Sequence, residues 1–325
     1  MSTSLHASTE SAPRADAAIT ARDLTKRFGD FTAVDGIDLD VHLGETFAFL
    51  GANGAGKTST MRMIATVSPV TDGTLTVLGM DPAADGQAIR SRLGVVPQED
   101  NLDLELTVRE NLLVYGLYHG LARRTIQERI VDLLDFAQLT DKAESPVDAL
   151  SGGMKRRLTI ARALINEPEM VLLDEPTTGL DPQARHVLWD RLHELRSRGV
   201  TLLLTTHYMD EAEQLADRLV VMDAGRIIAL GSPTELIARH VTREVLEVRF
   251  GSADQGRATE RLSGLGLDEV DSIESLAERA IVYTNDAEAT LDALERADLH
   301  PRGHLTRRAT LEDVFLRLTG RQLVD

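Results

Sequence analysis

The sequence predicts an α/β fold in which helices pack on the faces of a mainly parallel sheet. Three observations predict it. A glycine-rich loop, residues 51–58, follows the short apolar run 46–50. A second apolar run, 170–173, ends in the acidic pair Asp174 and Glu175. From there onward, strand-like and helix-like patterns alternate, as they do where crossover helices join parallel strands.

The residues before the glycine-rich loop form the first predicted element, an antiparallel β layer. Polar and apolar side chains alternate over residues 19–41, and Asp35-Gly36 supplies a candidate turn between two strands. After the loop we expect a helix from residue 57 to about residue 67. A short strand over residues 74–78 follows it.

The stretch 99–150 is predicted to form a helical subdomain inserted into this pattern. Val108, Leu112 and Tyr115 lie at i, i+4 and i+7, which is the spacing of one helix face. The same kind of spacing continues at Ile126, Ile130, Leu133 and Leu134.

The remaining elements of the sheet follow the acidic pair. A helix is indicated by the spacing of Ala184, Leu188, Leu192 and Leu195. Residues 201–205 then form a short apolar strand, and a pair of strands over residues 219–230 surrounds the turn Asp223-Ala224-Gly225.

The pattern changes near residue 240, where we expect a small α+β unit to begin. Residues 245–250 and 280–284 alternate as strands do, and residues 290–297 have helical spacing. Thr310 is a suitable N-cap for a last helix, and Asp313 is favourable in the first turn of that helix. No motif in this unit indicates chemistry.

The chain is therefore expected to divide into three parts. Residues 1–18 are rich in Ser, Thr and Ala and lack an apolar core, which is typical of a disordered tail rather than a signal peptide. Residues 19–240 would form the main domain, and residues 241–325 a small C-terminal domain.

Composition excludes several classes of protein. The 325 residues include 52 acidic and 35 basic side chains, and the net charge of −17 repels nucleic acid. No apolar run approaches the ~20 residues of a bilayer span. The absence of cysteine is compatible with a reducing cytoplasm.

Basic clusters occur at residues 155–157 and 302–308. A solvated helix face or a contact with phosphate explains the first better than a DNA-binding stripe does.

The glycine-rich loop has the pattern G-x-x-x-x-G-K-T, which predicts a nucleotide phosphate site. Backbone N–H groups of such a loop point at the phosphates, and the following helix adds its positive end. Lys57 supplies a charge, and Thr58 supplies a hydroxyl for Mg²⁺. The predicted nucleotide contacts in the loop are Gly51, Asn53, Gly54, Ala55, Gly56, Lys57, Thr58 and Ser59.

The acidic pair adds a candidate metal ligand. A parallel strand ends where α/β sheets place their ligands, so Asp174 would lie where Mg²⁺ beside Thr58 needs an oxygen ligand. Glu175 would lie one residue further out, toward the γ-phosphate. A buried strand capped by polar residues explains the apolar run but not the two acids.

With Ser151-Gly152-Gly153 and the acidic pair in place, the chain resembles the ATP-binding subunits of ATP-binding-cassette (ABC) transporters over roughly its first 240 residues. Further matches to the motifs of that family are Gln98 (Q-loop), Asp181 (D-loop), His207 (switch histidine) and Phe28 (A-loop aromatic, which stacks on adenine). Phe28 has an alternative, since Phe28 and Phe31 flank a Gly-Asp turn and either ring could simply pack on a strand face.

The resemblance implies a P-loop NTPase fold of the ABC cassette type and a mechanism of ATP hydrolysis. Thr58 and Gln98 would coordinate Mg²⁺, and Asp174 would bind it through water. Glu175 would polarise the attacking water, while His207 holds the water and the γ-phosphate. Lys57 would bind the phosphates.

The resemblance also implies a head-to-tail dimer. Ser151, Gly152 and Gly153 of a second copy would close the nucleotide site, with Asp181 beside them, so that two ATP molecules hold two chains together. ATP binding would close the pair, and hydrolysis would reopen it.

A partner in the membrane is implied as well, because the chain itself offers no path for a substrate. A separate permease would dock on a groove between the Gln98 loop and the helices from Thr107 to Leu134, which places the chain on the cytoplasmic face of the cell membrane. An apolar stretch at Leu102, Leu104 and Leu106 is a candidate contact, and core packing is the alternative.

The direction of transport and its cargo rest on the resemblance alone. The C-terminal segment resembles the tail domain of ATPases that serve ABC-2 exporters, where it could stabilise or regulate. Residues 101–113 and 176–185 are most similar to nodulation-factor (lipooligosaccharide) exporter ATPases, with daunorubicin-type drug exporters close behind. An importer subunit, or a soluble ABC ATPase of DNA repair or translation, is the alternative. Repair members need a long coiled coil, translation members carry two cassettes, and this chain has neither.

Overall fold

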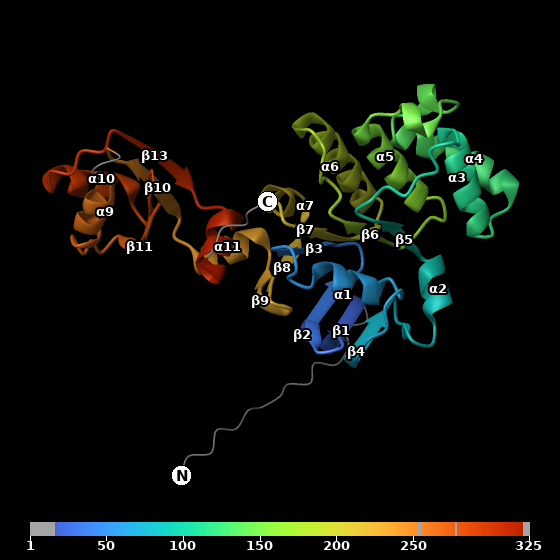
Figure 1. Cartoon of the computed structure of the whole chain (residues 1–325), viewed down its shortest axis with the longest axis horizontal. Coiled ribbons are helices and arrows are strands. Elements are labelled where there is room, and N and C mark those ends of the chain that lie inside the picture. The colour runs from blue at the N-terminus through green and yellow to red at the C-terminus, as the bar shows by residue number, and fades with distance from the viewer. Residues whose placement is uncertain (1–16, 252–254, 277, 321–325) are drawn as a thin grey trace, which may run out of the picture.

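The computed structural model of the chain describes residues 17–251, 255–276 and 278–320. The predicted tail over residues 1–18 therefore lies outside the described residues, apart from its last two, which begin the first strand. Figure 1 shows a large α/β body and a smaller unit set to one side of it. Within the described ranges, no helix combines the length and the apolar character that a bilayer crossing requires.

A six-stranded sheet forms the centre of the large body. Five strands are parallel, and the sixth is an antiparallel edge strand. In spatial order they are β5 (Leu93–Val96), β6 (Met170–Asp174), β7 (Thr201–Thr206), β3 (Thr46–Gly51), β8 (Arg218–Asp223) and β9 (Arg226–Gly231). Every residue of β3 and β7 is buried, because both faces of the sheet are covered there. The predicted α/β fold is confirmed.

Alternate side chains of the central strands pack into two separate cores. Phe47 and Phe49 of β3 face a core shared with α1 (Lys57–Ile64) and the antiparallel layer. Ala48 and Leu50 face the opposite core, to which the helical subdomain contributes. This period of two places consecutive residues at the end of β3 on opposite faces, and the chain then turns into the glycine-rich loop.

The antiparallel layer is a three-stranded sheet in which β1 is central. Its strands are β2 (Phe31–His42), β1 (Ala17–Phe28) and β4 (Asp72–Val77). The predicted layer is confirmed, and the turn between its first two strands is the Gly-Asp turn that Phe28 and Phe31 flank, at Gly29-Asp30. The prediction of a turn at Asp35-Gly36 was wrong. Residues 24 and 26 of β1 pair with residues 37 and 34 of β2, so β2 carries an extra residue there, and Gly36 adopts φ +63° in this bulge.

The stretch predicted as a helical subdomain, residues 99–150, contains α3 (Val108–Tyr118), α4 (Arg123–Phe136) and short 3-10 turns at Thr140–Lys142 and Val147–Ala149, and α5 (Gly152–Ala163) follows it. α3 begins with a capping box, in which Thr107 N donates to Glu110 Oε2 at 2.8 Å and Glu110 N donates to Thr107 Oγ1 at 3.2 Å. Helix α1 ends at Ile64 rather than near residue 67, because Thr66 adopts φ +60°. Helix α2 (Gly86–Ser91) was not predicted.

Three more helices complete the large body: α6 (Pro182–Ser197), α7 (Met209–Leu215) and α8 (Pro233–His240). α6 confirms the helix predicted after the acidic pair. α7 begins two residues after His207, at the end of β7. Ser232 caps α8, and its hydroxyl accepts from Glu235 N at 3.2 Å.

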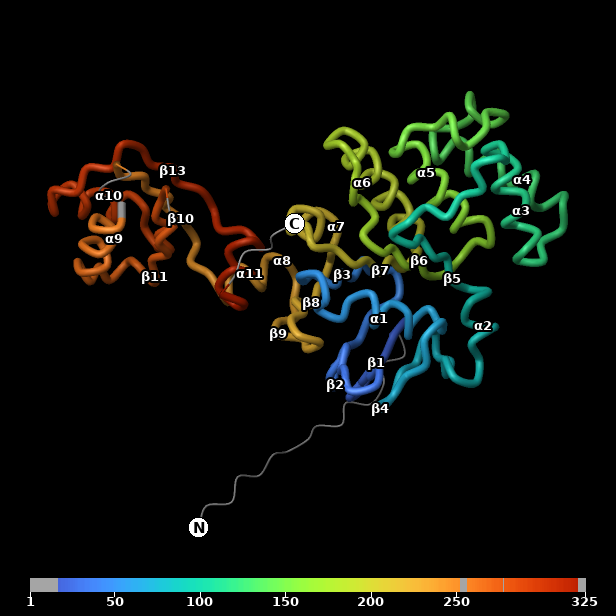
Figure 2. The backbone as a smooth tube through the Cα atoms, in the orientation of Figure 1, coloured from blue at the N-terminus to red at the C-terminus, as the bar shows by residue number. Residues whose placement is uncertain are grey.

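The C-terminal unit is a four-stranded antiparallel sheet with helices packed on it (Figure 2). Its elements are β10 (Glu244–Arg249), α9 (Gln255–Ser263), β11 (Val270–Ser275), β12 (Ala280–Thr284), α10 (Ala287–Arg296) and β13 (Gly303–Arg308). The last helix, α11 (Leu311–Thr319), returns to pack against α7 and α8. Thr310 N donates to Asp313 Oδ2 at 2.8 Å, in agreement with the predicted helix start. α9, β11 and β13 were not predicted.

Candidate nucleotide site

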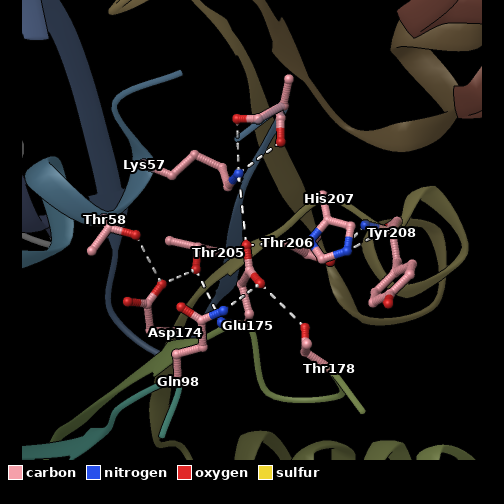
Figure 3. A network of polar contacts seen from close by, with 12 residues as sticks. Lys57, Thr58, Gln98, Asp174, Glu175, Thr178, Thr205, Thr206, His207 and Tyr208 are labelled. Carbon is pink, nitrogen blue, oxygen red and sulfur yellow. Dashed lines mark hydrogen bonds and ion pairs between the residues drawn. The ribbon is translucent and has the colours of Figure 1, made fainter. Parts of the chain in front are cut away.

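The candidate site lies at the carboxyl ends of β3, β6 and β7, where parallel α/β sheets place their ligands. Figure 3 shows that side chains from these three strand ends and from the loop after β5 converge on one point. The structure brings together six of the residues predicted from sequence: Lys57, Thr58, Gln98, Asp174, Glu175 and His207.

The glycine-rich loop connects β3 to α1 through a path that only glycine allows. Gly54 and Gly56 adopt φ values of +83° and +103°. A Cβ atom at Gly56 would lie 2.5 Å from the carbonyl oxygen of Ala33, and one at Gly51 would lie 2.4 Å from that of Met222. The loop therefore packs against the neighbouring backbone and leads directly into the amino end of α1, which favours anions.

Lys57 is the first residue of α1, and its ammonium is almost completely buried. Nζ donates to the carbonyl oxygens of Gly51 at 2.7 Å and Ala52 at 3.1 Å, and it lies 3.9 Å from Glu175 Oε1. Burial lowers the pKa of Lys57, while the carboxylates of Glu175 and Asp174 oppose this shift. The charge is thus held inside the loop by oxygen atoms.

Asp174 and its neighbours present oxygen atoms of the kind that Mg²⁺ prefers. Thr58 Oγ1 donates to Asp174 Oδ1 at 3.3 Å, and Thr205 Oγ1 donates to the same oxygen at 2.5 Å. A hydroxyl and a carboxylate beside a phosphate loop fit Mg²⁺, which takes few protein ligands and keeps phosphate oxygens and water. Among the described residues, no group of three His, Cys, Asp or Glu side chains is arranged to hold a metal by itself.

Glu175 is the centre of the polar network in Figure 3. Its Oε2 accepts from Gln98 Nε2 and from Thr178 Oγ1, both at 3.2 Å. Its Oε1 lies 3.2 Å from His207 Nδ1. Gln98 therefore contacts Glu175, whereas a role in metal binding would require its amide oxygen to reach Thr58 and Asp174. The carboxylate is buried and lies between Lys57 and His207, the histidine that follows β7.

The aromatic residue expected to stack on adenine is on the surface. The ring of Phe28 is 54% exposed, that of Phe31 is 63% exposed, and Lys26 Nζ lies 4.9 Å from the centre of the Phe28 ring. Neither ring is buried in a core, and the Phe28 ring lies beside Lys26 of the same strand. An exposed aromatic ring is suited to stacking on a planar ligand.

The Ser151-Gly152-Gly153 motif lies in a separate hollow of about 480 Å³, away from Lys57. Ser151 caps α5 and accepts from Met154 N at 3.3 Å, and Asp181 caps α6 and accepts from Ala184 N at 2.9 Å. The structure thus brings Ser151 and Asp181 together in one hollow. Within one chain it does not bring them to the phosphate loop.

A second, apolar hollow of about 440 Å³ lies beside the phosphate site, between α1, β5 and α3. Its lining includes Met61, Val95, Pro97 and Tyr115. His119 also lines it, and burial lowers the pKa of this histidine. Of the apolar stretch predicted near this groove, Leu102 packs against the core while Leu104 is half exposed.

Three residues of the site's surroundings were missed. Thr205, at the end of β7, holds Asp174, and the sequence signal was a hydroxyl at the end of an apolar strand. Glu211 in α7 is completely buried. Arg156 is buried as well, so the expectation of a solvated face for residues 155–157 was wrong at this position. Helical spacing places Arg156 in line with buried Thr159 and Ile160, and this signal was available.

Comparison with protein families places two profiles on the chain. The profile described as "ABC transporter" matches residues 34–178, and the one described as "Nodulation factor export protein NodI, C-terminal domain" matches residues 262–320. The chain is 48% identical to the Nod factor export ATP-binding protein I of Paraburkholderia xenovorans, over 95% of this chain and 99% of that protein. It is also 48% identical to the protein of that name from Rhizobium meliloti, over 95% and 90% of the two chains.

Solved structures agree in fold. One is cbiO1 from Clostridium perfringens, part of the ABC transporter complex cbiONQ, with a TM-score of 0.64 and 28% identity over 69% of this chain and 92% of that one. Another is a dimeric ATP-binding cassette in a post-hydrolysis state bound to ADP and Pi, with a TM-score of 0.60 and 25% identity over 66% and 98% of the two chains.

Proposed function

This chain belongs to the ATP-binding subunits of ABC transporters, and from this premise we propose that it powers export of a lipooligosaccharide-type cargo through a separate membrane permease. The enzyme activity of the family is ATP hydrolysis. The observation that carries the proposal of export is that similarity to the Nod factor export proteins extends over 95% of the chain. It includes the C-terminal unit as well as the nucleotide-binding domain.

The proposed roles in hydrolysis follow from the contacts of each side chain. Lys57 and the amides of the phosphate loop bind the β- and γ-phosphates, and Phe28 stacks on the base. Thr58 and Asp174 would hold Mg²⁺, and Gln98 would join them if its amide turned away from Glu175. The ion would neutralise phosphate charge as bond cleavage proceeds. Glu175 accepts a hydrogen bond from the attacking water and orients it toward the γ-phosphate. His207 holds Glu175 Oε1 on one side and contacts the γ-phosphate on the other.

A second copy of the chain completes the site in this proposal. The hollow that holds Ser151, Gly152, Gly153 and Asp181 would face the γ-phosphate bound by the partner copy, in a head-to-tail dimer. Two features support this arrangement. Ser151 and Gly152 are exposed at the amino end of α5, where N–H groups favour an anion. A structural neighbour is described as dimeric with ADP and Pi bound.

The apolar hollow between α1, β5 and α3 is the proposed docking site of the permease, which we expect to be of the ABC-2 type. It adjoins the Gln98 loop, so a movement of that loop on hydrolysis would change the shape of the hollow. Docking would hold the chain peripherally on the cytoplasmic face of the cell membrane. Residues 19–240 are proposed to form the ATP-binding domain, with its helical subdomain at 99–150, and residues 241–325 the accessory domain.

Purification from membranes tests the proposal. The tagged chain, produced in its own host, should co-purify with an integral-membrane protein after mild detergent extraction. That complex, reconstituted in vesicles with the chain outside, should accumulate a labelled lipooligosaccharide inside when ATP is added. Accumulation of daunorubicin instead would change the cargo, movement of cargo out of the vesicles would indicate an importer, and the absence of any membrane partner would indicate a soluble ATPase.

A further inference from the structure

A buried arginine lies directly behind the acidic pair of the site. Arg156, in the second turn of α5, is 4% exposed. Its Nε donates to the carbonyl oxygen of Pro176 at 2.8 Å, and Nη2 donates to those of Asp174 at 3.0 Å and Glu175 at 3.2 Å. One guanidinium group therefore holds the carbonyl groups of three consecutive residues at the end of β6.

The same guanidinium also holds the loop that carries Gln98. Nη1 donates to the carbonyl oxygen of Pro97 at 2.5 Å and to that of Gln98 at 3.3 Å. The carboxylate of Asp100 lies 3.4 Å from Nη1 and balances part of its charge. A planar group with five N–H donors suits such a set of acceptors, and an ammonium group does not. Arg156 thus ties together the ends of β5 and β6, each of which carries a residue of the proposed site.

The backbone of Glu175 requires such support. Its φ is +45°, a left-handed conformation that residues other than glycine rarely adopt. On one side, Glu175 N donates to the carbonyl oxygen and the hydroxyl of Thr205, both at 3.1 Å. On the other side, its carbonyl oxygen accepts from Arg156. If either contact were lost, the backbone would relax toward a commoner φ, and the carboxylate would turn away from His207.

We propose that Arg156 is a positioning residue for ATP hydrolysis. It holds the backbone of residues 174–176, so that the Glu175 carboxylate stays directed at the attacking water. This inference rests on the proposed role of Glu175. Arg156 acts through that residue and through the Gln98 loop. A purely structural role makes a different prediction, because loss of packing alone would lower the melting temperature and the ATP affinity together.

Arg218 provides a matched control. Its guanidinium also donates to a backbone carbonyl oxygen, that of Asp40 at 3.2 Å, and also pairs with a carboxylate, that of Glu45 at 3.2 Å. It lies at the first residue of β8, at the end of the sheet opposite the site. Substituting either arginine by glutamine therefore removes a guanidinium that joins backbone carbonyl oxygen to a carboxylate. Arg156→Gln removes it beside the site, and Arg218→Gln removes it far from the site.

The test compares Arg156→Gln, Arg156→Lys and Arg218→Gln in the full chain. Arg156→Gln should lower kcat about 100-fold, the loss that a displacement of ~1 Å causes in an active site. ATP affinity should change by less than about 3-fold, because the phosphate loop is untouched. Arg156→Lys should give an intermediate kcat, since an ammonium can reach only some of the acceptors. Arg218→Gln should keep kcat within about 3-fold of wild type.

Hydrogen–deuterium exchange provides a readout that does not depend on activity. In Arg156→Gln and Arg156→Lys, the peptides that cover residues 97–100 and 174–178 should exchange faster than in wild type, and in Arg218→Gln they should not. If wild type shows no ATPase activity, the proposed function fails while this measurement still tests the contact. An unchanged kcat in Arg156→Gln, unchanged exchange, or a parallel loss of ATP affinity and melting temperature would overturn the proposal.

Discussion

Glu211 allows a quantitative test of how burial near the site shifts the pKa of a carboxyl group. This glutamate lies in α7, four residues after His207, and its carboxyl group is completely buried. Burial raises the pKa of Glu211 from 4.5 to about 7, although Thr206, Thr177 and Trp189 favour the charged form and oppose the shift. Between these two pH values, the carboxyl group of Glu211 is protonated in the folded chain and ionised in the unfolded chain.

The sign of the effect on stability follows from this difference. A carboxyl group whose pKa is raised by folding contributes stability that is complete below pH 4.5 and is lost as the pH rises through about 7. Each unit of pKa corresponds to ~1.4 kcal/mol, so the contribution lost between these limits is about 3 kcal/mol. Glu211→Gln, which keeps the shape of the protonated acid, should remove this pH dependence.

The assay is urea denaturation of wild type, Glu211→Gln and a surface control, Glu128→Gln, at several values between pH 5 and pH 8. The free energy of unfolding of Glu211→Gln, minus that of wild type, should increase by about 2.5 kcal/mol over this range, because part of the contribution is already lost at pH 5. The same difference for Glu128→Gln should stay constant, because its side chain is exposed. A constant difference for Glu211→Gln as well would refute the assignment of a protonated, buried carboxyl group.

Three further predictions concern the glycine-rich loop, His207 and the proposed shared site. Lys57→Ala should weaken ATP binding by about 2 kcal/mol, because a buried phosphate charge loses its partner. His207→Ala should keep the affinity for ATP and lower kcat. Calorimetry measures the affinity of each variant, and phosphate release measures its kcat. Gly56→Ala should lower stability by at least ~2 kcal/mol, since its φ of +103° and the nearby Ala33 oxygen leave no room for Cβ, and thermal melting checks this. Mixing Ser151→Arg and Lys57→Ala chains should restore part of the ATPase activity, because one site of each mixed dimer is intact; if the mixture forms no mixed dimers while wild type dimerises, the shared site is wrong.

Much of the fold could be predicted because its signals are local in sequence. The phosphate loop, the apolar strand before Asp174 and the cap at Thr310 each depend on a few neighbouring residues. A turn was wrongly predicted at Asp35-Gly36 because this pair has the composition of a turn, whereas the structure uses it for a bulge. Only the pairing with β1 distinguishes the two. β13 was missed because its side chains are mostly exposed, so it has no apolar alternation.

The support behind the site could be predicted only in part, because it depends on tertiary contacts. Nothing in the sequence around Glu175 indicates a φ of +45°, since this conformation is imposed by Thr205 and Arg156 from two distant elements. The burial of Arg156 was visible in its helical spacing, but its acceptors are backbone carbonyl groups, which leave no mark in the sequence. The identities of the site residues are predictions from motifs, to which the structure adds their convergence.

The central claim is that this chain hydrolyses ATP as a pair in which Glu175 activates water. Glu175→Gln tests it most directly, with molecular mass and phosphate release measured on the same sample in the presence of Mg²⁺ and ATP. The account predicts that this variant binds ATP, releases no phosphate and shifts from the mass of one chain to that of two. Normal phosphate release, or a mass that ATP leaves unchanged while ATP is bound, would contradict it.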